Sequence, residues 1–417
     1  MQVDSTRFSS LSPQRQIHLP APSPAARRLR PIAVTGTNGK TTTTAWIAGV
    51  LAAARLTPVM RTSTVGYFLD EEALGLPRDY EAFLDMMGYA ATRGARDVVL
   101  ELTSNALLHG YGAAFPARVA VFTNLSQDHL DKHMSPEAYL YAKSLLFTQM
   151  RPDGTAVLNA RDDASRILVR SVPKTARVLT YGVPTRGKAW CLADVEAKEV
   201  RTSWSGTEVD CVAQAPFTRR AFTLRTQAIG DVFAENALAA LTAAVAAGID
   251  LDVALTAIAN APAPPGRFEV MSKNPYVVVD YAHTPDALER TIAAARRLAH
   301  GKVTVVFGAA GERDRGKRVP MGVAATAADR VVLTSDNPRG EDPRAIADTV
   351  ALGLVGLRDV TIELDRRRAI EDAIATANPR DVVLVCGKGH EDVQIIGTKR
   401  HPFSDVDVVR GALRGPS

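Results

Sequence analysis

The chain has 417 residues, of which 46% are apolar and 23% charged, the balance of a soluble globular protein of two or three domains. Its 50 basic and 45 acidic residues are well mixed and leave a net charge of +5, too small and diffuse to indicate a nucleic-acid-binding surface. No apolar run approaches the roughly 18 residues of a membrane span. Three widely spaced cysteines without metal-ligand spacing indicate a reducing compartment. We therefore expect a cytoplasmic protein that binds neither nucleic acid nor membrane.

Residues 1–30 are rich in Ser, Pro, Arg and Ala, and Asp4 is their only acid. They contain no apolar signal core. We expect an extended tail or leader that runs into the first strand, and an organelle transit peptide is the alternative.

The segment Thr35-Gly36-Thr37-Asn38-Gly39-Lys40-Thr41-Thr42 follows a strand-like run and precedes an Ala-rich helical pattern. This order is typical of a phosphate-binding loop, in which glycines let backbone N–H groups approach phosphate oxygens at a helix N-terminus. Lys40 would reach the β- and γ-phosphates, and the Thr41 hydroxyl would bind Mg²⁺. The loop is shorter than a general Walker loop, so a Gly-Lys-Thr turn without a ligand is the alternative.

Residues 31–150 alternate strand-like and helix-like stretches, which predicts a parallel sheet with helices on its faces. The expected strands are 58–64, 97–102 and 118–123, and the expected helices are 80–93 and 139–149. Glu101 falls at the carboxyl end of its strand, where open α/β sheets bind ligands. A carboxylate there is well placed to hold Mg²⁺ against phosphates, although it could equally be a surface residue.

A second polar segment, residues 124–131, directly follows the strand at 118–123. Its His129 could be a metal ligand or an ordinary loop histidine. Lys143 follows fourteen residues later on the expected helix, where a lysine is normally just solvated. The residues alone do not decide either case.

Residues 151–230 contain short strand-like stretches, and residues 234–258 read as a helix. These strands are expected at 156–158, 177–181, 209–213 and 221–225. The Pro-rich stretch 261–266 is the clearest linker in the chain. We therefore divide the chain into a leader (1–30), a central domain (31–262) and a C-terminal domain (263–417).

A second α/β alternation follows the linker, with strands expected at 276–280, 303–307, 330–334, 360–364 and 381–385. Four of these strands are followed by polar segments that contain Gly or Pro, at 280–285, 308–318, 336–339 and 387–391. Because such segments meet at the carboxyl edge of a parallel sheet, they predict one rim of a binding cleft.

On these motifs the chain resembles the Mur ligase family over about residues 31–410, and most closely its diaminopimelate-adding members. The motifs that carry the resemblance are the phosphate loop, Asn124-Leu125-Ser126-Gln127-Asp128-His129-Leu130-Asp131, Asp280-Tyr281-Ala282-His283-Thr284-Pro285 and Gly387-Lys388-Gly389-His390-Glu391. The resemblance implies an α/β fold: a P-loop-containing central ATPase domain with a parallel sheet, plus a C-terminal Rossmann-like domain. The family also has an N-terminal UDP-binding domain, which thirty residues cannot form.

The resemblance implies an ADP-forming amide ligase. In such enzymes the acceptor carboxylate attacks the γ-phosphate of ATP, and the amino group of an amino acid then attacks the resulting acyl phosphate. ATP and Mg²⁺ are the implied cofactors, the partners are an amino acid and a small acceptor acid or peptide, and a monomer is expected.

The family's site residues carry over where the motifs match. The implied catalytic residues are Lys40, Glu101, His129 and Lys143, and the implied metal ligands are Thr41, Glu101, His129 and Lys143. Lys143 matches a carbamoylated lysine, a modification that turns the cation into a carboxylate-like anion. The implied ATP-binding residues are Gly36, Thr37, Asn38, Gly39, Lys40, Thr41, Thr42, Asn236, Arg267, Asp280, His283, Asp314, Lys317 and Arg318.

Asp336-Asn337-Pro338-Arg339 matches the form of its motif that accompanies diaminopimelate rather than lysine. Arg339 can take a carboxylate bidentately, and Glu391 would bind the distal ammonium. The implied amino-acid-binding residues are Arg313, Asp336, Asn337, Arg339, Gly387 and Glu391.

The chain departs from the family mainly at the acceptor side. The Thr-Thr-Pro acceptor loop is Gly75-Leu76-Pro77, the Ser-His after the metal glutamate is Ser104-Asn105, and an Asn near adenine is Phe233, which could stack on the base. We therefore expect an acceptor other than UDP-muramoyl-dipeptide. The alternatives are the family's ordinary cell-wall tripeptide synthetase, a folylpolyglutamate-synthase-like ligase, a non-catalytic nucleotide-binding homologue, and a P-loop kinase or GTPase.

Overall fold

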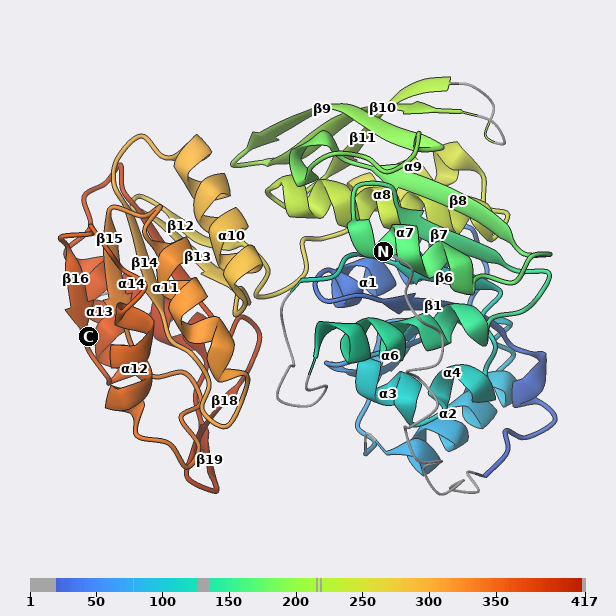
Figure 1. Cartoon of the computed structure of the whole chain (residues 1–417), viewed down its shortest axis with the longest axis horizontal. Helices are drawn as coiled ribbons and strands as arrows, with labels where there is room; N and C mark the ends of the chain where they lie inside the picture. Colours follow the sequence, from blue (N-terminus) through green and yellow to red (C-terminus); the bar gives the residue numbers. More distant parts are fainter. Residues whose placement is uncertain (1–19, 78, 127–134, 215–216, 218–219, 415–417) are drawn as a thin grey trace.

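The computed structural model describes residues 20–77, 79–126, 135–214, 217 and 220–414, and it forms two α/β bodies around two sheets (Figure 1). The first sheet has eleven strands in the order β11-β10-β9-β8-β7-β6-β1-β5-β2-β3-β4. They are β1 Arg30–Thr35, β2 Met60–Ser63, β3 Gly66–Leu69, β4 Glu72–Leu74, β5 Asp97–Glu101, β6 Val119–Phe122, β7 Thr155–Asn159, β8 Arg177–Gly182, β9 Val195–Ser203, β10 Gly206–Ala213 and β11 Arg220–Thr226. The seven neighbouring strands β9-β8-β7-β6-β1-β5-β2 pair in parallel. Antiparallel strands extend the sheet at both ends, β10 and β11 beyond β9, and β3 and β4 beyond β2.

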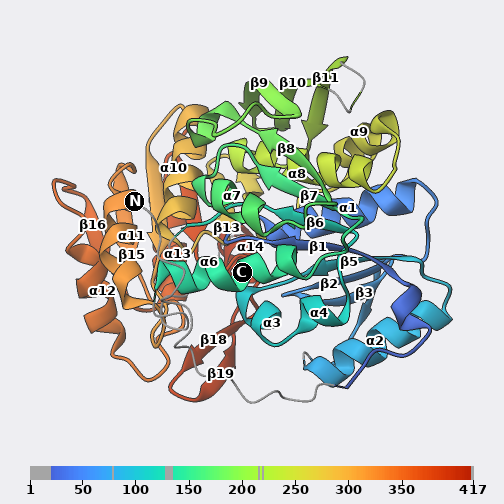
Figure 2. The same ribbon diagram turned by 45° about the vertical axis from the view of Figure 1, so that its right-hand side comes forward.

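Helices cover both faces of this sheet because its central strands are apolar on both sides. In β1 the side chains of Ile32 and Val34 pack into one core, and Ala33 between them packs into the other. The first face carries α1 Lys40–Ala53, α8 Asp231–Ala246 and α9 Leu251–Asn260, and the second carries α2 Tyr80–Thr92, α3 Ser104–Leu108, α4 Tyr111–Ala114, α6 Pro136–Thr148 and α7 Asp163–Leu168. Figure 2 shows β1, β5 and β2 between α1 and α9 above and α2, α3 and α4 below.

The second sheet has six strands in the order β12-β13-β17-β14-β15-β16, all parallel except β12. They are β12 Glu269–Lys273, β13 Tyr276–Asp280, β14 Val303–Phe307, β15 Arg330–Leu333, β16 Val360–Ile362 and β17 Val382–Cys386. Helices α10 Pro285–Leu298, α11 Arg318–Ala325 and α12 Pro343–Ala351 pack on one face, and α13 Arg366–Ala375 and α14 Asp405–Arg414 on the other. A hairpin of β18 Val393–Ile396 and β19 Lys399–Pro402 follows β17. The described part of the chain also has 3₁₀ turns at Ala26–Arg28, Val169–Ser171, Pro184–Arg186 and Arg315–Lys317.

The structure confirms the predicted fold class, and every predicted strand lies within two residues of an observed one except 209–213, which is the second half of β10. The predicted helix at 234–258 is two helices, α8 and α9, because the chain turns at Gly248 with a φ of +90°. Strands β3, β4, β9, β12, β18 and β19 were not predicted. They are short or, like β9, rich in charged residues with one face in solvent.

Several side-chain contacts among the described residues join the two bodies, and one of them is the Asn38 amide, which donates to Asp286 Oδ2 at 3.3 Å. Trp204, in the turn between β9 and β10, stacks on Tyr276 at 3.8 Å with an interplanar angle of 8°, and its indole N–H donates to Leu298 O at 3.3 Å. Arg290 on α10 forms ion pairs with Glu235 and Asp231 at the start of α8. No helix in the described part of the chain is long and apolar enough to cross a membrane.

Candidate functional site

The loop between β1 and α1 is braced by the segment that follows β6. The Thr37 N–H donates to Asn124 O at 2.8 Å, and the Asn38 N–H donates to Asn124 Oδ1 at 2.9 Å. The Thr123 hydroxyl donates to Asn38 O at 2.7 Å. The protein's own contacts therefore fix the shape of the loop.

Two positions in this loop accept only glycine. Gly36 has a φ of +151°, and a Cβ there would lie 1.9 Å from Thr123 Oγ1. Gly39 has a φ of +82°, and a Cβ there would lie 2.0 Å from Asn236 Oδ1. Because the first N–H groups of α1 have no intrahelical acceptor, the loop presents donors and a positive helix end to an anion.

Two lysines point at the loop. Lys40 Nζ donates to Thr37 O at 2.7 Å. Lys143, on α6 and 1% exposed, donates through Nζ to Gly36 O at 2.7 Å and lies over the Tyr139 ring at 4.2 Å. Lys143 is therefore buried beside the loop, unlike the solvated lysine that its helix alone would suggest.

Glu101 ends β5 beside the start of α1. Its Oε2 accepts from the Thr41 hydroxyl at 2.9 Å and from the Thr64 N–H at 3.1 Å. A buried carboxylate and a hydroxyl at a helix N-terminus fit the oxygen ligands that Mg²⁺ prefers. His129, the other predicted ligand on this side, lies outside the described residues. Within the described ranges, no group of three or more His, Cys, Asp or Glu side chains could hold a metal ion.

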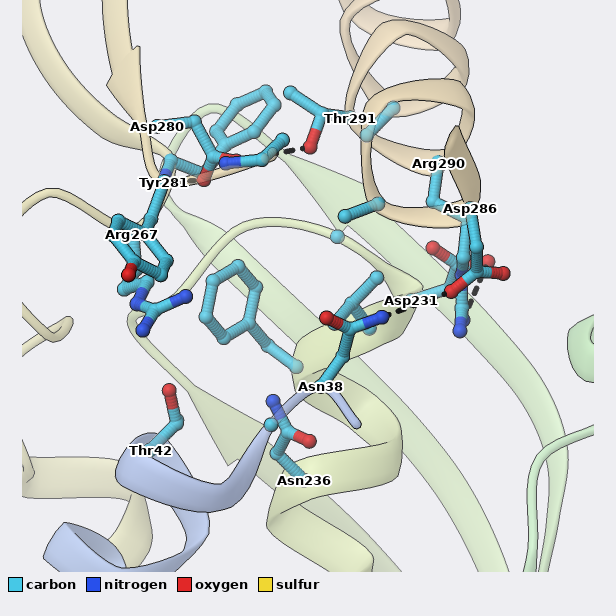
Figure 3. A pocket seen from close by; sticks show the side chains of 18 of the residues that line it. Asn38, Thr42, Asp231, Asn236, Arg267, Asp280, Tyr281, Asp286, Arg290 and Thr291 are labelled. Carbon is cyan, nitrogen blue, oxygen red and sulfur yellow. Dashed lines mark hydrogen bonds and ion pairs between the residues drawn. The ribbon is translucent and has the colours of Figure 1, made fainter. Parts of the chain in front are cut away.

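A cavity of about 690 Å³, measured to its open mouth, lies between the two bodies and is called here the interdomain cleft (Figure 3). Seven predicted ATP-binding residues line it: Asn38, Gly39, Thr42, Asn236, Arg267, Asp280 and His283. The cleft also has an apolar wall that includes the Phe233 and Phe268 rings.

Asp280 holds the far wall of the interdomain cleft together (Figure 3). Its carboxylate accepts from the N–H groups of Phe268 at 2.6 Å and Ala282 at 2.8 Å, and from the Thr291 hydroxyl at 3.2 Å. Burial raises the pKa of Asp280. The Arg267 guanidinium lies 4.2 Å from the centre of the Tyr281 ring, so these two side chains form one side of the cleft.

A second cavity of about 770 Å³, called here the rim pocket, lies at the carboxyl edge of the second sheet. All four polar segments that follow strands contribute to it, as predicted. Its lining residues are Tyr281, His283, Gly308, Ala309, Ala310, Arg313, Asp314, Lys317, Asp336, Asn337, Arg339, Gly387 and Glu391. All six predicted amino-acid-binding residues are among them. Asp314 and Lys317, predicted to approach the nucleotide, line this pocket instead of the interdomain cleft, and Arg318 lines neither because it pairs with Glu341 at 2.9 Å.

Two polar atoms of the rim pocket are buried without a hydrogen-bond partner among the described residues: Arg339 Nε and Asp314 Oδ2. Burying a polar atom without a hydrogen-bond partner costs about 1–3 kcal/mol of stability. A ligand group that bonds to either atom would recover this energy. The guanidinium needs an acceptor such as a carboxylate, and the carboxylate needs a donor such as an ammonium. The pocket therefore suits a ligand that carries both charges.

Lys388, which sequence reasoning missed, lies beneath the rim pocket and is fully buried. Its Nζ donates to Val393 O at 2.7 Å, to Asn337 Oδ1 at 3.0 Å and to Glu391 Oε2 at 3.4 Å. The Asn337 amide in turn donates to Glu391 Oε2 at 3.2 Å. Lys388 and Asn337 thus position Glu391. A lysine between two glycines directly after a buried strand was the available signal.

Comparison with known proteins places the chain in a class and then in a family. The Mur ligase middle domain matches residues 34–244, and the Mur ligase glutamate ligase domain matches residues 266–389. These two matches cover most of the chain and define an ATP-dependent acid–amino-acid ligase. The chain belongs to the Mur ligase family.

Similar relatives are named UDP-N-acetylmuramoyl-L-alanyl-D-glutamate–2,6-diaminopimelate ligase. Those of Synechococcus elongatus and Aquifex aeolicus are each 39% identical, over 93% and 94% of this chain and 77% and 78% of their own length. A solved structure with this name is 34% identical with a TM-score of 0.64, and covers 93% of this chain and 78% of that one. Folylpolyglutamate synthase of Mycobacterium tuberculosis, complexed with ADP, is 18% identical with a TM-score of 0.71 over 94% and 92% of the two chains, and it shows the shared fold alone.

Proposed function

We propose that the chain joins a diaminopimelate-like amino acid to the carboxylate of an acceptor other than UDP-muramoyl-dipeptide, with ATP converted to ADP and phosphate. The observation that carries the amino acid is the rim pocket, where Arg339 Nε and Asp314 Oδ2 both lie buried without a described partner. Diaminopimelate has carboxylate and ammonium groups at both ends, so one molecule can satisfy both atoms.

The nucleotide binds with its phosphates on the loop and its base in the interdomain cleft. This placement is supported by the donors at the start of α1 and by continuity of the cleft with Asn38, Gly39 and Thr42. Lys40 exchanges its bond to Thr37 O for a phosphate oxygen. Thr41 and Glu101 would hold Mg²⁺, which supplies further neutralisation of the phosphate charge.

The reaction has two displacements. An oxygen of the acceptor carboxylate forms a bond to the γ-phosphorus, and the bond from that phosphorus to the bridging oxygen of ADP breaks. The nitrogen of the amino acid, as a free amine, then attacks the acyl carbon, and phosphate leaves. Asp314 Oδ2, buried in the rim pocket, is placed to take the proton that the ammonium must lose. Lys143, as a carbamate formed with CO₂, would add a carboxylate-like group beside the loop.

The second candidate acceptor is the one in the relatives' names, UDP-N-acetylmuramoyl-L-alanyl-D-glutamate. The identity of 38–40% to those relatives favours it. The departures at Gly75-Leu76-Pro77 and Asn105 favour a different acceptor, because hydroxyl and imidazole groups that could bind a polar peptide are replaced there.

A phosphate-release screen that crosses amino acids with acceptors tests this function. We expect ADP and phosphate to form with diaminopimelate and a simpler acid, and lysine to be a poor substitute. Full activity with UDP-muramoyl-dipeptide and none with simpler acids would overturn the acceptor assignment. Depletion of CO₂ from the buffer should lower the rate if Lys143 is carbamoylated, and an unchanged rate would contradict that modification.

A further inference from the structure

The hairpin of β18 and β19 projects from the lower end of the second body (Figure 1). All four residues of its outer strand, β19, are exposed, and so is the turn formed by Gly397 and Thr398. None of the hairpin side chains belongs to the apolar core clusters that the described residues form. Packing of apolar side chains in a core therefore does not account for the position of the hairpin.

The inner strand of the hairpin, β18, bonds instead to the segment 336–339 of the rim pocket. The Gln394 side-chain amide donates to Asp336 O at 2.9 Å. The Ile395 N–H donates to Asn337 Oδ1 at 2.9 Å. The hairpin thus supports, from outside the pocket, the segment that is predicted to distinguish diaminopimelate from lysine.

The same strand fixes the backbone of Arg339. This residue has a φ of +54°, in the left-handed region that is unfavourable for a residue with a Cβ. Its N–H donates to Ile395 O at 3.0 Å, and its carbonyl oxygen accepts from the Gly397 N–H at 2.7 Å. Because both backbone groups of Arg339 bond to the hairpin, these bonds hold the residue in its strained conformation and set the direction of its side chain.

The two halves of the segment differ in their support. The first half has a second support, because the Gly311 N–H donates to Asn337 O at 2.9 Å. Arg339, at the end of the segment, carries the Nε atom that is buried in the rim pocket without a described partner. The guanidinium that needs a ligand group therefore stands on a backbone whose conformation depends on the hairpin.

We propose that the β18–β19 hairpin positions the amino-acid site: it holds Arg339 in its left-handed conformation and so directs the guanidinium at the distal carboxylate of a diaminopimelate-like substrate. This inference rests on the proposed function and extends its selectivity to residues outside the pocket. Gln394 is a positioning residue in this arrangement. It does not line the rim pocket, and it acts through Asp336.

A shortened hairpin tests the proposal. Val393 and Pro402 pair directly across the hairpin, so a Gly-Gly turn can join them in place of residues 394–401. The replacement removes every bond from the hairpin to the segment 336–339. It keeps Val393 O, which accepts from Lys388 Nζ, so the support of Glu391 from below is retained.

Two point variants refine the test. Gln394→Met removes only the hydrogen bond to Asp336 O and keeps the length of the side chain. His401→Met is the matched control, because His401 lies directly opposite Gln394 in the hairpin and is exposed on the outer strand.

Calorimetric titration with diaminopimelate and with lysine gives the readout. We expect the shortened hairpin to raise the Kd for diaminopimelate about 100-fold, as much as Arg339→Met does, and to change the Kd for lysine much less. Gln394→Met should raise the Kd for diaminopimelate about fivefold, and His401→Met should change neither value. The Kd for ATP and the Tm of the shortened chain should stay close to those of the wild type, because the hairpin lies outside the cores.

Combining Arg339→Met with the shortened hairpin separates positioning from a general structural role. If the hairpin acts through Arg339, the combined variant binds diaminopimelate no more weakly than either single variant, since both changes remove the same interaction. Additive losses would overturn the proposal. An unchanged Kd in the shortened chain, equal losses for the two amino acids, or a parallel loss of ATP binding would overturn it as well.

The titrations also separate failure of this inference from failure of the proposed function. A wild-type chain that prefers diaminopimelate, with a shortened chain that keeps the preference, would refute the role of the hairpin and leave the proposed amino acid standing. A wild-type chain that prefers lysine, or that binds neither amino acid, would refute the proposed function itself.

Discussion

The phosphate loop and the rim pocket are built in opposite ways. In the loop, the N–H groups of Thr37 and Asn38 already have acceptors in Asn124, so the backbone is fixed by the protein itself. In the rim pocket, Arg339 Nε and Asp314 Oδ2 are buried without a described partner. The first region is preorganised for a ligand that is the same in every turnover. The second has polar atoms that a ligand of complementary charge would satisfy, so under the proposed function we expect selectivity for the amino acid to reside there.

The largest effect should come from breaking the preorganised loop. Gly36→Ala forces a Cβ to within 1.9 Å of Thr123 Oγ1, so the loop must move and its donors lose their alignment. We expect kcat/KM for ATP to fall by about 10³-fold or more. Steady-state kinetics and a circular dichroism spectrum measure this. Gly411→Ala, in an open helical position, is the control, and an active Gly36→Ala enzyme would show that the loop tolerates movement.

The next effect should come from the rim pocket. Arg339→Met removes the guanidinium that we assign to a carboxylate, and we expect the KM for diaminopimelate to rise about 100-fold. The KM for lysine, which lacks the distal carboxylate, should change much less, so the selectivity between the two amino acids should collapse. Arg344→Met, at an exposed position on α12, should leave both values unchanged. Equal losses for both amino acids would assign Arg339 to a shared group or to structure.

A smaller effect should come from one of the contacts between the two α/β bodies, the stack of Trp204 on Tyr276. Trp204→Ala removes the stack on Tyr276 and the bond to Leu298 O. We expect a loss of about 2 kcal/mol of stability, since the side chain is only partly buried. Differential scanning calorimetry should then show two transitions, one for each body. Trp204→Phe should retain much of the stack, and a single unshifted transition in Trp204→Ala would mean that the stack does not couple the bodies.

The smallest effect concerns Glu341, which supports the rim through Arg318. The hydrogen bond from Arg318 lowers the pKa of Glu341 from 4.5 to about 2. Because the folded-state pKa is below the unfolded one, this stabilisation is full above pH 4.5 and is lost as the pH falls toward 2. Glu341→Gln should therefore lower the Tm by a few degrees at pH 7, equivalent to about 1 kcal/mol, and the difference should vanish near pH 2. A difference that is constant with pH would point to packing instead of charge.

The sequence was sufficient for the buried strands. β1, β5 and β13 contain apolar runs that end in a polar residue, and β14 and β17 are largely apolar and are followed by glycine. The solvent-exposed strands at the ends of the first sheet, such as β9, do not show this change from apolar to polar residues. The helical pattern alone could have indicated that Lys143 is buried. It lies on one buried stripe of α6 with Tyr139, Ala142, Leu146 and Phe147, and a lysine in an apolar stripe is unusual. The partners of Lys388 and the packing of Arg267 on Tyr281 are tertiary contacts that no local pattern encodes.

The two tight glycines of the phosphate loop also limit how the motif can be transplanted. Gly36 and Gly39 are required by Thr123 and Asn236, which belong to a different strand end and to α8. A loop grafted alone onto another scaffold would lose the neighbours that determine its shape. A working transplant must carry β1, α1, the Thr123–Ser126 segment and the first two turns of α8 as one unit. The functional unit is thus a packed cluster of four chain segments and not the eight-residue loop motif alone.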